Sequence, residues 1–211
     1  MAKHFVLVAG NIGSGKTSLT ERIGKRLGWE TAYESVVDNP YLSDFYQDMA
    51  KWSFHLNVFF LGDRADQHFD LATMSKSAII DRSIYEDAEI FARAAVDLGS
   101  LSERDYQTYR RVYELVVQGL PSPDLLVYLT APTSVLLERI RQRGREMEQG
   151  VSLDYLNLLE KYYDEWLAVF DLCPVLTIRT DNHDFVHQPE HLDLVVSRIR
   201  DKLLGREVIE F

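Results

Sequence analysis

The sequence contains one cysteine and no long hydrophobic run. Cys173 cannot form an internal disulfide, and its neighbours Leu172 and Pro174 suggest a small buried side chain rather than a nucleophile. The apolar run at residues 5–9 is too short for a signal-peptide core, and no stretch approaches the about 20 apolar residues of a membrane span. We therefore expect a protein of the reducing cytoplasm without a membrane partner.

Basic residues are outnumbered by acidic ones. The chain has 23 Lys and Arg against 33 Asp and Glu, a formal net charge of -10 at pH 7. Because nucleic-acid binding depends on Lys and Arg that neutralise phosphates, this balance argues against a nucleic-acid partner. A site for a phosphorylated ligand must then be basic locally.

The pattern of apolar residues predicts one α/β domain over residues 1–211. Short runs rich in Val, Ile and Leu alternate with longer segments of helical periodicity, which is typical of a parallel sheet covered by helices. We predict a five-stranded parallel sheet flanked by helices. The predicted strands are Phe5–Ala9, Thr31–Tyr33, Ala78–Ile80, Leu125–Leu129 and Val175–Ile178, and the predicted helices are Lys16–Leu27, Trp52–Ser75, Asp87–Asp97, Glu103–Val117, Ser134–Arg143, Leu153–Phe170 and His191–Leu204.

A glycine-rich loop joins the first predicted strand to the first predicted helix. It matches the phosphate-loop pattern G-x-x-x-x-G-K-[ST], in which backbone N–H groups and a helix N-terminus surround a triphosphate. Lys16 is expected to reach the β- and γ-phosphates, and the Thr17 hydroxyl is placed to coordinate Mg²⁺. The loop residues are Gly10, Asn11, Ile12, Gly13, Ser14, Gly15, Lys16 and Thr17.

Three further motifs follow the loop in order, and they limit the kind of phosphate-loop protein. Glu34 and an N-P-Y-L stretch precede W-S-F at residues 52–54, D-R-S-I-Y-E-D occupies residues 81–87, and R-G-R-E-M-E-Q-G occupies residues 143–150. The N-K-x-D motif with which GTPases read their base is absent. From the loop to about residue 185 the chain resembles the deoxyribonucleoside kinases, and the 81–87 stretch is most similar to bacterial deoxyadenosine kinases.

The resemblance implies transfer of the γ-phosphate of ATP, with Mg²⁺, to the 5′-hydroxyl of a deoxyribonucleoside. It also implies an arginine-rich lid at about residues 139–150 and a homodimer built through the helices Asp87–Asp97 and Glu103–Val117. An amphipathic core helix has the same pattern as a dimer helix, so both interpretations stay open. A protein that binds ATP without an acceptor is an alternative of another class, but it gives the later motifs no purpose.

The catalytic and ATP-binding roles implied by the resemblance fall on charged residues at strand ends and in the lid. Glu34 would be the general base, and Arg82 would bridge the acceptor hydroxyl and the phosphate. Asp81, at the carboxyl end of a strand, would hold the metal through water, together with Thr17. The lid arginines Arg143 and Arg145 would meet the γ-phosphate, while Arg139, Asp184 and Phe185 would lie against the adenine of ATP.

The acceptor roles implied by the resemblance fall on two sets of residues. Tyr46 and Glu148 would hydrogen-bond the sugar 3′-hydroxyl, and the tyrosine ring would leave little room for a 2′-hydroxyl. The base would be read by Trp52, Asn57, Arg64 and Asp87. Most relatives have Gln at the position of Asn57, and the shorter side chain widens the pocket in favour of a purine, so we expect deoxyadenosine, with deoxyguanosine and deoxycytidine as alternatives.

Substitution of Glu34 by Gln tests the predicted general base. Loss of the proton acceptor should lower turnover by about 10²–10⁴-fold and leave ATP binding near normal. Steady-state kinetics and an ATP titration measure the two quantities, with Glu103→Gln as a control for the change in charge. Full activity in the Glu34→Gln variant would exclude this residue as the base.

Overall fold

The computed structural model describes residues 3–33, 39–145, 148–181 and 188–205. Five strands form one parallel sheet with the order β2-β3-β1-β4-β5, which confirms the predicted fold class. The second strand begins one residue before the predicted position, and the other four begin where predicted. The strands are β1 (Phe5–Gly10), β2 (Glu30–Ala32), β3 (Ala78–Asp81), β4 (Leu125–Thr130) and β5 (Val175–Arg179).

Helices connect the strands and cover both faces of the sheet. Most predicted helices end within two residues of their observed ends. The helices are α1 (Lys16–Leu27), α2 (Leu42–Gln47), α3 (Met49–Thr73), α4 (Ile84–Glu86), the π-helix η1 (Asp87–Phe91), α5 (Ala92–Asp97), α6 (Glu103–Gln118), α7 (Thr133–Arg143), α8 (Leu153–Val169) and α9 (Pro189–Leu203). None of these helices is both long and apolar enough to cross a membrane.

Three differences from the predicted helices have identifiable causes. Helix α3 begins at Met49 rather than Trp52 because the Asp48 side chain accepts from the backbone N–H of Lys51. The helix predicted from Asp87 begins at Ile84, since Ser83 and Glu86 form a capping box, and it continues as a π-helix before α5. The short helix α2 was not predicted, because it has no buried residue and so no apolar face to reveal it.

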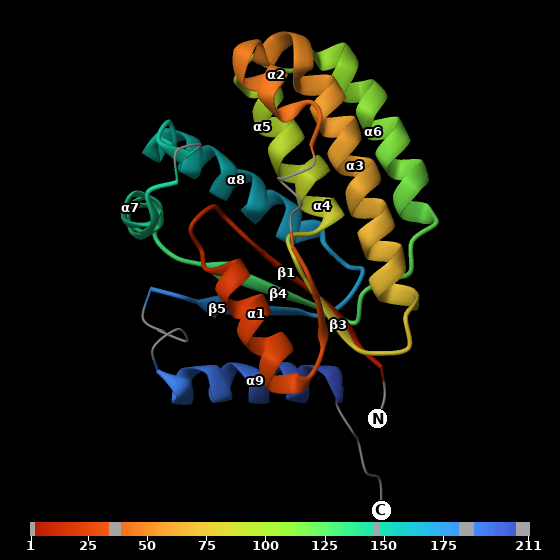
Figure 1. Ribbon diagram of the computed structural model, residues 1–211, viewed down its shortest axis with the longest axis vertical. Coiled ribbons are helices and arrows are strands. Elements are labelled where there is room, and N and C mark those ends of the chain that lie inside the picture. Colours follow the sequence, from red (N-terminus) through yellow and green to blue (C-terminus); the bar gives the residue numbers. More distant parts are fainter. Residues whose placement is uncertain (1–2, 34–38, 146–147, 182–187, 206–211) are drawn as a thin grey trace, which may run out of the picture.

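Helices lie on both faces of the sheet (Figure 1). The side chains of β1 alternate between two buried cores. Val6 and Val8 pack with residues of α1 and α9, including Ile23 and Ile199. Leu7 points to the opposite face, where α3, α5, α6 and α8 lie. A strand buried on both sides needs a continuous apolar sequence, which is the pattern found in residues 5–9.

Cys173 packs at the edge of the larger core. Burial raises the pKa of its thiol to about 12. A thiol with such a pKa carries almost no thiolate at neutral pH, and the thiolate is the nucleophilic form. Cys173 is thus a packing residue at the core, although it is partly buried rather than fully buried.

The carboxyl ends of all five strands meet at one edge of the sheet. In the parallel register Val8 pairs with Asp81, and Gly10 pairs with Leu129. The phosphate loop after β1 and the polar segment after β3 are consequently neighbours. This edge is where open α/β sheets bind their ligands.

Candidate active site

The phosphate loop leaves β1 at Gly10, which has φ of 147°. A Cβ at this position would lie 2.4 Å from the Leu129 carbonyl oxygen, so only glycine lets the loop pass so close to β4. The loop ends at Gly15, which caps α1 in a left-handed conformation with φ of 98°. The N–H groups of the first turn of α1 therefore face the concave side of the loop, where an anion is stabilised.

Lys16 is buried and its ammonium group lies inside the loop. Its Nζ donates to the carbonyl oxygens of Gly10 and Asn11 at 2.7 and 3.0 Å. Only 7% of the residue is exposed. The ammonium is thus held among backbone oxygens at the place where the motif predicts a triphosphate.

Thr17 and Asp81, the residues predicted to hold the metal, are in direct contact. The Thr17 hydroxyl donates to Asp81 Oδ2 at 2.5 Å, although the residues lie on α1 and β3. The described residues contain no group of three or more His, Cys, Asp or Glu side chains suited to a metal. One carboxylate and one hydroxyl fit Mg²⁺, which is usually held by few protein oxygens together with water and substrate phosphates.

Arg82 has a left-handed backbone with φ of 71°, which is uncommon for a residue with a side chain. Its guanidinium lies over the ring of Phe91, 4.3 Å from the ring centre. Burial raises the pKa of the neighbouring Tyr155, an effect that Arg82 opposes and Tyr46 strengthens. Arg82 and Tyr46 are therefore both within electrostatic reach of one tyrosine on α8.

Arg64 and Asp87 form a buried ion pair. Arg64 Nε donates to Asp87 Oδ2 at 2.6 Å, and the two side chains are 1% and 12% exposed. Asp87 opens the π-helix, whose wider turn is frequent at functional sites. Asn57, two turns before Arg64 on α3, donates from Nδ2 to the Ser53 carbonyl oxygen at 2.8 Å.

Two other predicted acceptor residues lie near the surface. Tyr46 is 51% exposed and packs edge-on against Phe45, so its ring is not part of the core. Trp52 is partly buried between two aromatic rings, with His55 of α3 at 5.1 Å and Tyr41, the residue before α2, at 5.9 Å between centroids. The predicted roles of Tyr46 at the sugar and of Trp52 at the base stay predictions.

The arginines at the end of α7 are engaged with protein groups. Arg139 donates to the Thr180 side chain at 2.8 Å and to its carbonyl oxygen at 2.6 Å, which places it beside the end of β5. Arg143 makes a two-point contact with Glu148, at 2.6 and 3.1 Å. Arg145 lies 3.7 Å from the same carboxylate. A carboxylate and two guanidinium groups thus form one cluster.

Three predicted site residues lie outside the described part of the chain. They are Glu34, Asp184 and Phe185. Their predicted roles stay predictions.

Several residues that contact the phosphate loop were not predicted from the sequence. The Glu86 carboxylate accepts from the Gly10 N–H at 3.2 Å, and the Tyr163 hydroxyl lies 2.7 Å from it. Asn11 Nδ2 donates to Glu160 on α8 at 3.0 Å. The S-x-x-E spacing of Ser83 and Glu86 could have revealed the capping box, but no local pattern reveals the contact with Gly10.

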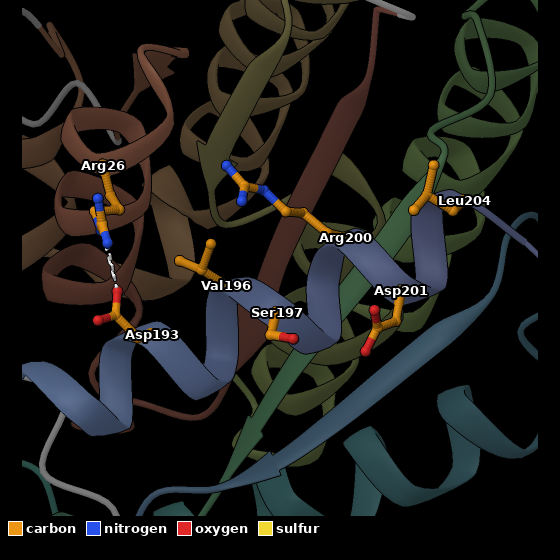
Figure 2. A pocket seen from close by; sticks show the side chains of 7 residues that line it. All are labelled: Arg26, Asp193, Val196, Ser197, Arg200, Asp201 and Leu204. Carbon is orange, nitrogen blue, oxygen red and sulfur yellow. Dashed lines mark hydrogen bonds and ion pairs between the residues drawn. The ribbon is translucent and has the colours of Figure 1, made fainter.

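A pocket elsewhere on the molecule contains none of these residues (Figure 2). It lies between the C-terminal end of α1 and α9, whereas the phosphate loop lies at the other end of α1. Its Arg26 is already paired with Asp193 at 2.9 Å. The lining residues are Arg26, Asp193, Val196, Ser197, Arg200, Asp201 and Leu204.

The sheet-edge geometry agrees with comparisons of the whole chain. A model of the deoxynucleoside kinase family matches residues 6–204. The chain belongs to this family. The resemblance inferred from the motifs is thereby confirmed, and the chain is a nucleoside kinase with ATP as its phosphate donor.

Members of the family with different base preferences are similar to this chain. A deoxyadenosine/deoxycytidine kinase of Bacillus subtilis is 40% identical, covering 92% of this chain and 90% of the relative. A deoxyguanosine kinase of Lactobacillus acidophilus is 36% identical, covering 94% and 90%. A deoxyadenosine kinase from M. mycoides with bound dATP has a TM-score of 0.79 at 28% identity, covering 93% of this chain and 100% of that one.

Substitution of Gly10 by Ala tests the steric constraint at the start of the phosphate loop. The left-handed backbone and the clash with the Leu129 carbonyl should lower the free energy of unfolding by at least about 1–3 kcal/mol and weaken ATP binding. Gly62→Ala on α3 is the control, because a Cβ there meets nothing within 4 Å and should be neutral or slightly stabilising. Equal unfolding midpoints for the two variants would contradict this account.

Proposed function

We propose that this kinase phosphorylates the 5′-hydroxyl of deoxyribonucleosides with a preference for deoxyadenosine. The observation that carries the proposal is the buried Arg64–Asp87 pair, which joins α3 to η1, the helix whose Phe91 lies against Arg82. One sheet edge thus combines groups for a triphosphate with a buried polar pair suited to a base. The similar Bacillus subtilis enzyme is a deoxyadenosine/deoxycytidine kinase, which supports deoxyadenosine as one acceptor.

The phosphate half of the site would work by positioning and charge. Lys16 would exchange its carbonyl partners for β- and γ-phosphate oxygens, and Thr17 with Asp81 would hold a Mg²⁺ ion. When bound, the ion would neutralise charge on the phosphates. Arg82 would donate two hydrogen bonds toward the acceptor hydroxyl and the transferring phosphate, a geometry that suits a guanidinium.

The cluster of Arg143, Arg145 and Glu148 would supply positive charge during phosphoryl transfer. The γ-phosphate would compete with Glu148 for Arg143 and Arg145, while Arg139 would lie against the adenine of ATP with Asp184 and Phe185. A transition-state arginine contributes about 10³–10⁵-fold in related phosphoryl transfers. Glu148, together with Tyr46, would then be available to the sugar 3′-hydroxyl.

The base half of the site favours an exocyclic amino group. Asp87 is a hydrogen-bond acceptor fixed by Arg64, and adenine and cytosine present an amino group where guanine presents a carbonyl oxygen. An acceptor facing the guanine carbonyl would be unfavourable. With Trp52 and the short Asn57 beside it, the arrangement fits adenine best, cytosine next and guanine least.

An exposed apolar face supports a homodimer. On α6, Val112 and Leu115 are 43% and 72% exposed, and Val58 and Phe69 on the neighbouring α3 are 38% and 51% exposed. We propose that α3 contributes to the pairing beside α6, which is one of the two helices named from the resemblance. The need for cellular ATP further supports a cytoplasmic location.

A phosphorylation panel tests the proposed function. The purified chain, labelled ATP and Mg²⁺ are incubated with each of the four deoxyribonucleosides and with adenosine. We expect the highest kcat/KM for deoxyadenosine, with deoxyguanosine lower by about 10–100-fold, the cost of one or two poorly matched buried polar contacts. Preferred phosphorylation of deoxyguanosine would contradict the base preference, whereas ATP hydrolysis without a nucleotide product would contradict acceptor phosphorylation.

Substitution of Asn57 by Gln tests the width of the base pocket. The added methylene should narrow the pocket and lower the purine-to-pyrimidine ratio of kcat/KM by about tenfold or more. Gln107→Asn on α6 is the control, because Gln107 is exposed and its side chain donates to Glu103 on the same helix. An unchanged acceptor profile in Asn57→Gln would exclude pocket width as the cause of the preference.

A further inference from the structure

The Glu86 carboxylate is fully buried, and none of the catalytic roles above uses it. Its exposed fraction is 0%. Oε1 lies 3.2 Å from the Gly10 nitrogen and 2.7 Å from the Tyr163 hydroxyl. Oε2 lies 2.8 and 3.1 Å from the backbone nitrogen and hydroxyl of Ser83. Burying a carboxylate costs free energy unless hydrogen-bond donors surround it. The loss of any of these four contacts would therefore be unfavourable.

The donors come from three separate segments of the chain. Gly10 is the first residue of the phosphate loop, Ser83 follows Arg82, and Tyr163 lies on α8. The capping role of Glu86 explains only the contacts with Ser83. Its contacts with Gly10 and Tyr163 join the helix N-terminus to two elements that the cap does not require.

The contact with Ser83 fixes the backbone beside Arg82. The Ser83 N–H belongs to the peptide that follows Arg82, whose φ of 71° is a strained conformation. Such a conformation persists only where surrounding contacts enforce it. The Glu86 carboxylate is therefore placed to hold the direction in which the Arg82 side chain leaves the backbone.

Helix α8 also contacts the phosphate loop directly. The Tyr163 hydroxyl lies 2.8 Å from the Gly10 carbonyl oxygen as well as near Glu86, and Asn11 Nδ2 donates to the Leu156 carbonyl oxygen at 3.0 Å. Burial raises the pKa of Tyr163 well above its ordinary value, so the hydroxyl keeps its proton and remains a donor. The first two loop residues are thus held by α8.

We propose that Glu86 is a positioning residue for phosphoryl transfer, which ties the Arg82 peptide to the phosphate loop and to α8. Its carboxylate keeps the guanidinium and the triphosphate in one relative position. The inference rests on the kinase activity of the family and is independent of the proposed base preference.

The experiment compares Glu86→Gln and Tyr163→Phe with the parent chain. Gln keeps the size of Glu but presents an NH₂ donor to a set of donors, so one contact must break. We expect kcat to fall by up to about 10²-fold, the effect of a displacement near 1 Å at reacting groups. KM for ATP and for the nucleoside should change by less than about threefold, because the binding groups remain.

The second variant and a matched control separate positioning from folding. Tyr163→Phe removes only the hydroxyl, and the double variant should lose less than the product of the single losses, because both changes act on one carboxylate. Glu89→Gln is the control, since Glu89 lies three residues further along the helix and pairs with Arg110. It should keep the parental kcat even if its unfolding midpoint falls.

Two results would overturn the inference. One is a folded Glu86→Gln variant with a parental kcat, and the other is an equal loss of kcat in Glu89→Gln. If Glu86→Gln does not fold, a parental kcat in Tyr163→Phe overturns it and a lowered kcat supports it. A best acceptor other than deoxyadenosine contradicts only the base preference, because the same kcat comparison is then made with that acceptor.

Discussion

The parallel pairing of β1 with β3 and β4 is the constraint on which the site depends. The register that opposes Val8 to Asp81 puts the phosphate loop and the Asp81–Arg82 segment at the same edge of the sheet. The pairing of Gly10 with Leu129 brings the loop so close to β4 that a side chain at residue 10 has no space. Hydrogen bonds of the sheet thus set distances between groups that are far apart in the sequence.

Buried charge is the second theme of the structure, and each buried group has partners. Arg64 and Asp87 contact each other, while Glu86 is surrounded by N–H and O–H donors. Removing one member of such a set leaves the other buried without compensation, which is more costly than losing a surface ion pair. The apolar cores hold the sheet and helices together, and these polar contacts fix the orientation of α4 and η1.

The fold could be predicted from the sequence because its signals are local. The apolar run at residues 5–9 and the glycine pattern that follows it specify a buried strand, a phosphate loop and a helix start. The resemblance to the family placed Arg64 and Asp87 in one set of base-reading residues, and the structure pairs them. The fold inferences needed only spacing and residue type, whereas the assignment of Arg64 and Asp87 needed the resemblance to the family.

The remaining features depend on contacts between distant segments. The left-handed backbone of Arg82 and the π-helix at Asp87 follow from how α4 and η1 fit between the loop and α8, and no local pattern signals either. Glu86 has the sequence signature of an ordinary helix cap, which hides its contact with Gly10. The pairing of Arg143 with Glu148 depends on how the chain turns after α7.

On the proposed roles, that last pairing would link the binding of the two substrates thermodynamically. Glu148 is shared between Arg143 and Arg145, so on the proposed roles a triphosphate gains these guanidinium groups only as the carboxylate gives them up. The released carboxylate is the group proposed to receive the sugar hydroxyl. Donor and acceptor would then strengthen each other's binding by the same factor, since a coupling free energy between two sites is reciprocal.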